Sequence, residues 1–180
     1  MKKILIVLFA LLLVGCNLVE TVSPKATATT LMDSLKSMDF ETAKSVADEE
    51  LKTKIDELKA MADRDPASGA MIKKILGMFD YEILSEDMTD DSATVTLKIR
   101  GLSKEALQQI SDDVLQAGFS VTDPSNTEEI SRAVQSAIEA IDLQKLERWD
   151  REIKLNLTKD GNEWFFSQDT LKRLTDTLLP

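Results

Sequence analysis

The chain has 180 residues, with 32 acidic and 22 basic side chains and a formal net charge of −10 at pH 7. Histidine is absent, which excludes the catalytic triads and metal centres that depend on an imidazole. An acidic chain is also poorly suited to nucleic acid, because proteins bind it mainly through cationic contacts to phosphate. We therefore expect no nucleic-acid partner and no metal site.

The N-terminus has the pattern of an export signal. Lys2 and Lys3 precede an unbroken apolar run over residues 4–14. A helix needs about 20 apolar residues to cross a bilayer, so this run is too short for a membrane span and has the length of a secretory signal. The only cysteine of the chain, Cys16, follows directly after Leu13-Val14-Gly15.

This tetrad resembles the lipobox of bacterial lipoproteins. The resemblance implies cleavage between Gly15 and Cys16, removal of residues 1–15, and a covalent diacylglycerol on the Cys16 thiol. Residues 16–23 would form a lipidated N-terminus and tether. The protein would then be exported and anchored to the cell membrane or the outer membrane, facing outside the cytoplasm, because two acyl chains on one residue anchor stably. The alternative is an ordinary signal peptide with an incidental cysteine.

The sequence pattern predicts helices in the first part of the remaining chain. Apolar residues recur at helical spacing from residue 26 to 38, and Asp39 is a suitable N-cap for a second helix. That second stripe continues to residue 62. The sequence Arg-Asp-Pro with Ser-Gly at residues 64–69 then breaks the pattern before a short third helix at residues 71–76.

Two hairpins follow, separated by a helical segment. Alternating apolar and polar residues predict strands at 79–83 and 93–99, joined by a polar turn, and again at 149–157 and 163–166. Residues 103–148 between these hairpins read as helical, with a capping box at Asn126 or Ser125. A short helix ends the chain. This order predicts one α+β domain over residues 24–180, with helices packed on an antiparallel sheet.

Three stretches carry a wider resemblance: "SMDFETA", "SATVTLKI" and "LTKDGNEWFFSQD". Together with the lipobox they resemble small exported lipoproteins with a nuclear transport factor 2-like (cystatin-like) domain of unknown function. The resemblance implies a long N-terminal helix lying across a curved antiparallel sheet that forms a cone. The helical insertion at residues 103–148 departs from a plain cone and leaves the strand order open.

The alternation of the predicted strands places one group of side chains on the inner face of the sheet. These are Phe79, Tyr81, Leu97, Trp149, Arg151, Trp164 and Phe166. They either line an apolar pocket for a small ligand or pack against the helices as ordinary core. An inward Arg151 would need an anionic partner, unless it lies exposed at the start of its strand.

Two further hypotheses concern a calcium site and an acid–base catalytic site. The acidic stretch at residues 86–91 has oxygen ligands suited to Ca²⁺ but lacks the pattern of an EF-hand, so we expect a solvated turn. Tyr81 with nearby carboxylates is the remaining acid–base candidate, and no spacing singles out a pair. We therefore expect a non-catalytic binding or scaffolding module with a protein partner in the cell envelope and no cofactor beyond the diacylglycerol. One alternative is a protein that binds small molecules or lipids in a pocket. The other is a small enzyme using Tyr81 and carboxylates.

Overall fold

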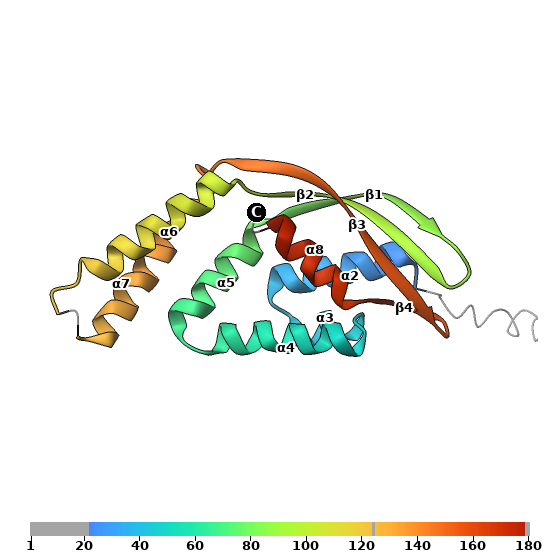
Figure 1. Ribbon diagram of the computed structural model, residues 1–180, viewed down its shortest axis with the longest axis horizontal. Helices are drawn as coiled ribbons and strands as arrows, with labels where there is room; N and C mark the ends of the chain where they lie inside the picture. The colour runs from blue at the N-terminus through green and yellow to red at the C-terminus, as the bar shows by residue number, and fades with distance from the viewer. Residues whose placement is uncertain (1–21, 124, 179–180) are drawn as a thin grey trace, which may run out of the picture.

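The computed structural model describes residues 22–178 apart from Pro124, so the predictions for the signal peptide and for Cys16 lie outside the described residues. Helices cover one face of a four-stranded antiparallel sheet, and the other face of the sheet is open (Figure 1). The α+β prediction is therefore confirmed. No described helix is both long enough and apolar enough to cross a bilayer.

Each N-terminal helix begins at a polar cap. The elements are α2 (Pro24–Ser37), α3 (Phe40–Ser45), α4 (Glu49–Asp63) and α5 (Pro66–Met78). The side chains of Ser23, Asp39, Asp48 and Asp65 accept hydrogen bonds from backbone N–H groups in the respective first turns. Such caps satisfy donors that have no partner inside the helix.

The prediction of one continuous helix to residue 62 is wrong, because the chain leaves the helix at residues 46–48. There Phe166 N donates to Val46 O at 2.9 Å, and Asp48 N donates to Phe166 O at 2.9 Å. This short parallel bridge to the last strand replaces the helical hydrogen bonds, and Asp48 then caps α4. The apolar spacing continues through the break, which is why the periodicity alone does not reveal it.

The sheet has the order β1-β2-β3-β4. Its strands are β1 (Asp80–Met88), β2 (Ser92–Leu102), β3 (Arg148–Asp160) and β4 (Glu163–Phe166), and all neighbouring pairs are antiparallel. Both predicted hairpins are present. Gly161 in the second turn has φ +61°, a conformation that L side chains rarely adopt.

β1 is longer than predicted, because it continues through residues that read as a turn. The register shifts between Ile83 and Ser85, which leaves Leu84 as a bulge. Beyond the bulge the Glu86 carboxylate accepts a 2.8 Å hydrogen bond from Lys25 N in the first turn of α2. An anion is favourable at a helix N-terminus, so this polar segment is ordered by a contact distant in sequence.

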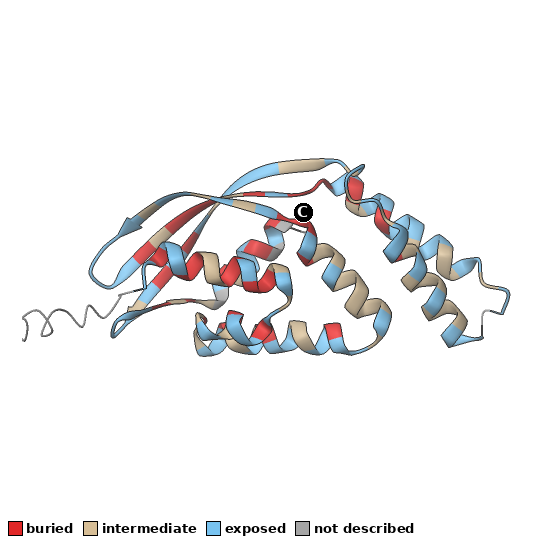
Figure 2. Cartoon of the chain, turned by 180° about the vertical axis from the view of Figure 1, so that it is seen from behind, coloured by how far each residue is buried: buried red, intermediate tan, exposed pale blue. Residues whose placement is uncertain are grey.

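The segment between β2 and β3 is a helical hairpin of α6 (Lys104–Phe119) and α7 (Thr127–Ala140). It extends from the end of the molecule opposite to the start of α2 (Figure 1). Most of its surface is exposed or half-buried, in contrast to the body under the sheet (Figure 2). A small apolar cluster around Met78, Leu102 and Ile110 attaches it to the rest of the fold.

The core lies between the sheet and the helices beneath it, with the C-terminal helix α8 (Gln168–Leu178) among them (Figure 1). Its largest fully buried side chains come mainly from α2, α4, the inner face of β2, β3 and β4, and α8; they include Leu31, Met32, Ile55, Leu97, Leu155, Phe166 and Leu174. The outer face carries mainly charged and polar side chains.

Candidate ligand-binding cavity between the helices

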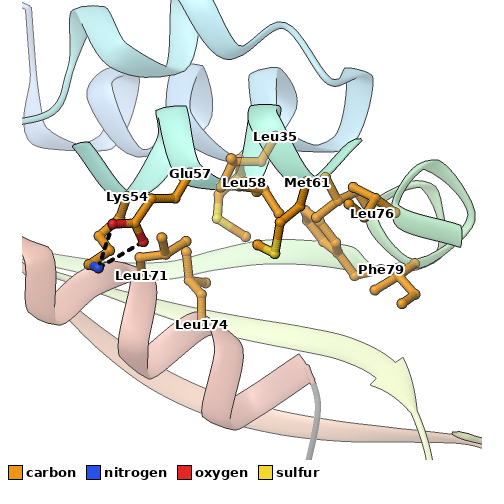
Figure 3. Close-up of a pocket in the computed structure, with 12 residues that line it drawn as sticks. Leu35, Lys54, Glu57, Leu58, Met61, Leu76, Phe79, Leu171 and Leu174 are labelled. Atoms are coloured by element: carbon orange, nitrogen blue, oxygen red, sulfur yellow. Dashed lines mark hydrogen bonds and ion pairs between the residues drawn. The ribbon is translucent and has the colours of Figure 1, made fainter. Parts of the chain in front are cut away.

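A cavity of about 410 Å³ lies between α2, α4, α5 and α8, and we refer to it as the helical cavity. Its wall consists of leucine, isoleucine and methionine side chains with one aromatic ring, Phe79, and one ion pair. Figure 3 shows Leu58 and Met61 of α4 facing Leu171 and Leu174 of α8 across this space. Small-molecule sites are commonly concave and apolar, with volumes of roughly 300–1,000 Å³.

The cavity lies beside the second half of α4, where the apolar side chains are less buried than in the first half. Leu51 and Ile55 in the first half of α4 are 1% and 0% exposed. Further along the same stripe Leu58 is half-buried and Met61 is 44% exposed. Ile72 and Ile75 of α5, on the opposite wall, are also half-buried. Apolar surface that would normally be removed from water is therefore left partly hydrated here.

The corner between α4 and α5 fixes one end of the helical cavity. Gly69 approaches the α4 backbone so closely that a Cβ there would lie 2.8 Å from Ala62 O. Only glycine permits this approach without movement of the backbone. The close corner sets the separation of the two helices whose side chains form the walls.

One ion pair stands at the side of the cavity. Lys54 Nζ lies 2.8 Å from Glu57 Oε2, and the two side chains are 39% and 55% exposed (Figure 3). Exposed pairs of this kind contribute little to stability, about 0–1 kcal/mol. The pair leaves this part of the wall without net charge while keeping a donor and an acceptor next to the apolar lining.

Of the seven residues predicted on the inner sheet face, Phe79 is the one that lines the helical cavity. Leu97, Trp164 and Phe166 are buried, with exposures of 0%, 4% and 0%, and belong to the core under the sheet. The structure therefore brings these four together as packed side chains, with a cavity on one side of Phe79. Of the other three, Tyr81 and Trp149 are half-buried and Arg151 is exposed.

Tyr81 is held by a specific partner. Its hydroxyl donates a 2.6 Å hydrogen bond to Asp33 Oδ1 on α2. Burial, together with this bond to Asp33, raises the pKa of Tyr81 to about 12. The phenol is therefore protonated at neutral pH and serves as a donor between β1 and α2.

Arg151 and Trp149 form their own pair on the inner face of β3, as the strand register requires. Arg151 is exposed, and its guanidinium carbon lies 4.4 Å from the centre of the Trp149 ring. The cation–π contact satisfies the cation without an anionic ligand. The Trp149 indole N–H is shielded from solvent and has no acceptor among the described residues.

An ion-pair network on the outer sheet face was not predicted from the sequence. Asp150 of β3 accepts from Arg100 Nε at 2.7 Å and lies 3.0 Å from Lys98 Nζ. These two cations hold the pKa of Asp150 far below its usual range. Asp80 similarly pairs with Lys36 and Arg148, and the Lys36 hydrogen bond lowers the pKa of Asp80.

Apart from Phe79, sequence reasoning also missed the walls of the helical cavity. Their residues sit on regular apolar stripes of α4, α5 and α8, which indicate packing and do not show whether the packing is complete. The available signal is the density of apolar residues on both sides of Gly69, with Met61 before it and Ile72 after it.

The chain matches no known protein-family model and has no significant match among curated proteins. Its fold is similar to the crystal structure of a "putative lipoprotein (ycdA)" from Bacillus subtilis, with a TM-score of 0.50 and 15% sequence identity. The similarity covers 87% of this chain and 58% of the Bacillus protein, so this chain matches little more than half of that protein's length. At such low identity the likeness concerns the fold alone.

Proposed function

We propose that this protein is an exported bacterial lipoprotein, anchored through diacylglycerol on Cys16, whose domain binds or scaffolds other molecules at the cell envelope without catalysis. The tetrad Leu13-Val14-Gly15-Cys16 directly behind the apolar run of residues 4–14 is the observation that carries this proposal. The description of the Bacillus protein of similar fold as a lipoprotein is consistent with it.

The position of α2 supports an anchor close to the domain. Ser23 already caps α2, so residues 16–23 are the whole length of the proposed tether. An extended chain spans at most about 3.3–3.6 Å per residue, which would keep the domain within roughly 30 Å of the bilayer. The α6–α7 hairpin, at the opposite end of the molecule from the start of α2 (Figure 1), would be the part of the domain farthest from the attachment point.

The finer fold that we propose is a nuclear transport factor 2-like cone enlarged by the α6–α7 hairpin. Support comes from α2, a long first helix that packs against the inner sheet face through Leu31 and Met32. The four strands follow one another in the sheet in chain order, so the hairpin lengthens a connection without changing the sequence of neighbours.

The absence of catalysis is part of the proposal. No Asp or Glu within residues 22–178 is buried, so none of these carboxyls has the dry environment that raises a carboxyl pKa toward neutrality. The Tyr81 hydroxyl donates a hydrogen bond to Asp33 and has a pKa of about 12, far from the neutral range in which a general acid or base works best.

Substitution of the cysteine tests the anchor. Cells that express the full chain are labelled with a radioactive fatty acid, and Cys16→Ser should abolish incorporation and leave residues 1–15 attached. In the matched control, Cys16→Ser combined with Ser23→Cys, a thiol is present outside the tetrad and no label should return. Labelling that survives Cys16→Ser would overturn the proposal.

Cross-linking in intact cells tests the binding role. A photoreactive amino acid in place of Phe119, which is 85% exposed on α6, should give discrete cross-linked products with an envelope component. The same amino acid at Met88, which is 61% exposed at the end of β1, serves as the control site. The absence of discrete products from every exposed site tested on the domain would contradict a scaffolding role.

A further inference from the structure

We propose that the helical cavity binds a single hydrocarbon chain, with the polar end of the ligand at Lys54 and Glu57. The inference rests on the proposed binding role and names the chemical class of the ligand. The same chemistry is offered by a free fatty acid and by one acyl chain of a phospholipid.

The lining of the cavity selects for hydrocarbon. Apart from Lys54 and Glu57 its walls are built from aliphatic and thioether side chains with the ring of Phe79. A ligand with polar groups along its length would lose hydrogen bonds to water and find no replacement. A hydrocarbon chain loses nothing of this kind and gains the burial of partly hydrated surface on Leu58, Met61 and Ile72.

The shape of the lining favours a chain over a flat ring system. Met61, which is 44% exposed, supplies a flexible side chain that adapts to a ligand. Phe79, the single aromatic side chain among the described residues of the wall, is 1% exposed and packed in the core, so it cannot form two faces of a slot around a planar ring. Branched aliphatic walls fit an unbranched chain through many weak contacts.

The ion pair gives the cavity a polar end. Lys54 Nζ is paired with Glu57 at 2.8 Å and its side chain is 39% exposed, so it can turn to a carboxylate or phosphate without leaving a buried charge unpaired. Glu57 would then remain in water, because its side chain is already 55% exposed. This arrangement orients an amphiphile with its chain toward Phe79 and its head toward solvent.

Photo-cross-linking tests the proposal on the full chain. The protein is purified with its anchor and reconstituted into phosphatidylcholine vesicles, and a palmitic acid analogue with a diazirine near the chain end is added. Illumination should place the adducts on α4 and α5 peptides that line the cavity. A second set of vesicles carries the diazirine in the phospholipid acyl chain, and the adduct mass then separates the two sources of the chain.

A matched pair of substitutions decides whether the adducts come from the cavity. Leu58→Trp fills the cavity and should lower the adducts on α5 at least tenfold, whereas Leu115→Trp, at a 55% exposed site on α6, should leave them unchanged. Ile72→Phe is a smaller filling variant in case Leu58→Trp does not fold. Adducts spread evenly over the surface, no adducts at all, or adducts insensitive to both folded filling variants would overturn the proposal.

The same samples keep this proposal separate from the anchor. The intact mass of the protein shows whether Cys16 carries a lipid, independently of adducts in the cavity. An unlipidated chain that is cross-linked in the cavity would contradict the anchor and support the ligand. A lipidated chain without cavity adducts would do the reverse.

Discussion

The Tyr81 hydroxyl on β1 donates a 2.6 Å hydrogen bond to Asp33 Oδ1 on α2, and this contact joins the edge of the sheet to the first helix. Glu86, farther along β1, holds the N-terminus of the same helix, because its carboxylate accepts a hydrogen bond from Lys25 N. Two side chains of one edge strand thus fix α2 at two points about two helical turns apart. The orientation of α2 under the sheet follows from these contacts as well as from its buried leucines.

The titration of Tyr81 is accessible because it is the only tyrosine in the chain. Burial and Asp33 raise its pKa to about 12, so an ultraviolet titration of the folded protein should show a single late transition. The raised pKa contributes stability that is fully present below the ordinary value of about 10 and is lost as the pH rises through the folded value.

Tyr81→Phe provides the control for this titration. The variant should lack the phenolate transition, and its free energy of unfolding should fall less steeply than that of the wild type between about pH 10 and pH 12. A wild-type transition near pH 10 in the folded protein would show that the Tyr81 hydroxyl is neither buried nor hydrogen-bonded to Asp33 in solution.

The two halves of α4 should respond differently to truncation. Ile55→Ala removes a fully buried side chain and should cost about 2–5 kcal/mol in the free energy of unfolding. Leu58→Ala removes a half-buried side chain that faces the helical cavity, and it should cost about 1 kcal/mol because less surface returns to water. Equal losses in urea denaturation would mean that Leu58 is packed like Ile55 and that the cavity is closed.

Gly69→Ala tests the close corner between α4 and α5. Alanine in a helix is intrinsically favoured over glycine by about 1 kcal/mol, but here its Cβ would meet Ala62 O at 2.8 Å. Since backbone must move, we expect a net loss of about 1–3 kcal/mol in thermal or chemical denaturation. The control is Gly77→Ala, where a Cβ meets nothing within 4 Å and the helix preference should give a small gain.

Arg100→Gln tests the ion pairs on the outer sheet face. Loss of the Arg100 hydrogen bond should raise the pKa of Asp150 toward its ordinary value, leaving Lys98 as the remaining cation. A carboxyl with a depressed pKa contributes stability above its unfolded pKa that is lost as the pH falls through the folded value. The measurement is a carbon-detected NMR titration. The same Asp150 titration curve in wild type and variant would contradict the ion pair between Arg100 and Asp150.

The elements of the fold were largely predictable, because amphipathic periods and caps are local signals. Asp39 and Asn126 mark helix starts in the sequence, and the structure has helices directly after both. The break at residues 46–48 was not predictable, because it depends on hydrogen bonds to Phe166, far away in the sequence. The full length of β1 was hidden by its polar residues, which nevertheless pair with β2 beyond the bulge, with Glu86 also bonded to Lys25 N.

The candidate site was likewise predictable in part. The inner sheet face was recognised as apolar, but a sequence cannot show whether an apolar face is completely covered by its neighbours. Phe79 lines the helical cavity while Leu97 does not, although both belong to the same alternating pattern. What separates them is their place in the fold: Phe79 directly follows α5, whose side chains form one wall of the cavity, whereas Leu97 lies within β2 under the sheet.

The pairing of β2 with β3 extends to Leu102 and Arg148, so the chain enters and leaves the α6–α7 hairpin from directly opposite positions of one ladder. A segment inserted in this way can be exchanged as a module, because the strands are already in register on either side of it. The outer surface and reach of this projection can therefore vary while the sheet stays as it is. The side of the hairpin that packs on α5 is constrained, because Ile75 belongs both to the attaching cluster and to the wall of the helical cavity. A short turn grafted in its place would have to compensate only for the apolar side chains it uncovers on α5 and at the end of β2, notably Met78 and Leu102.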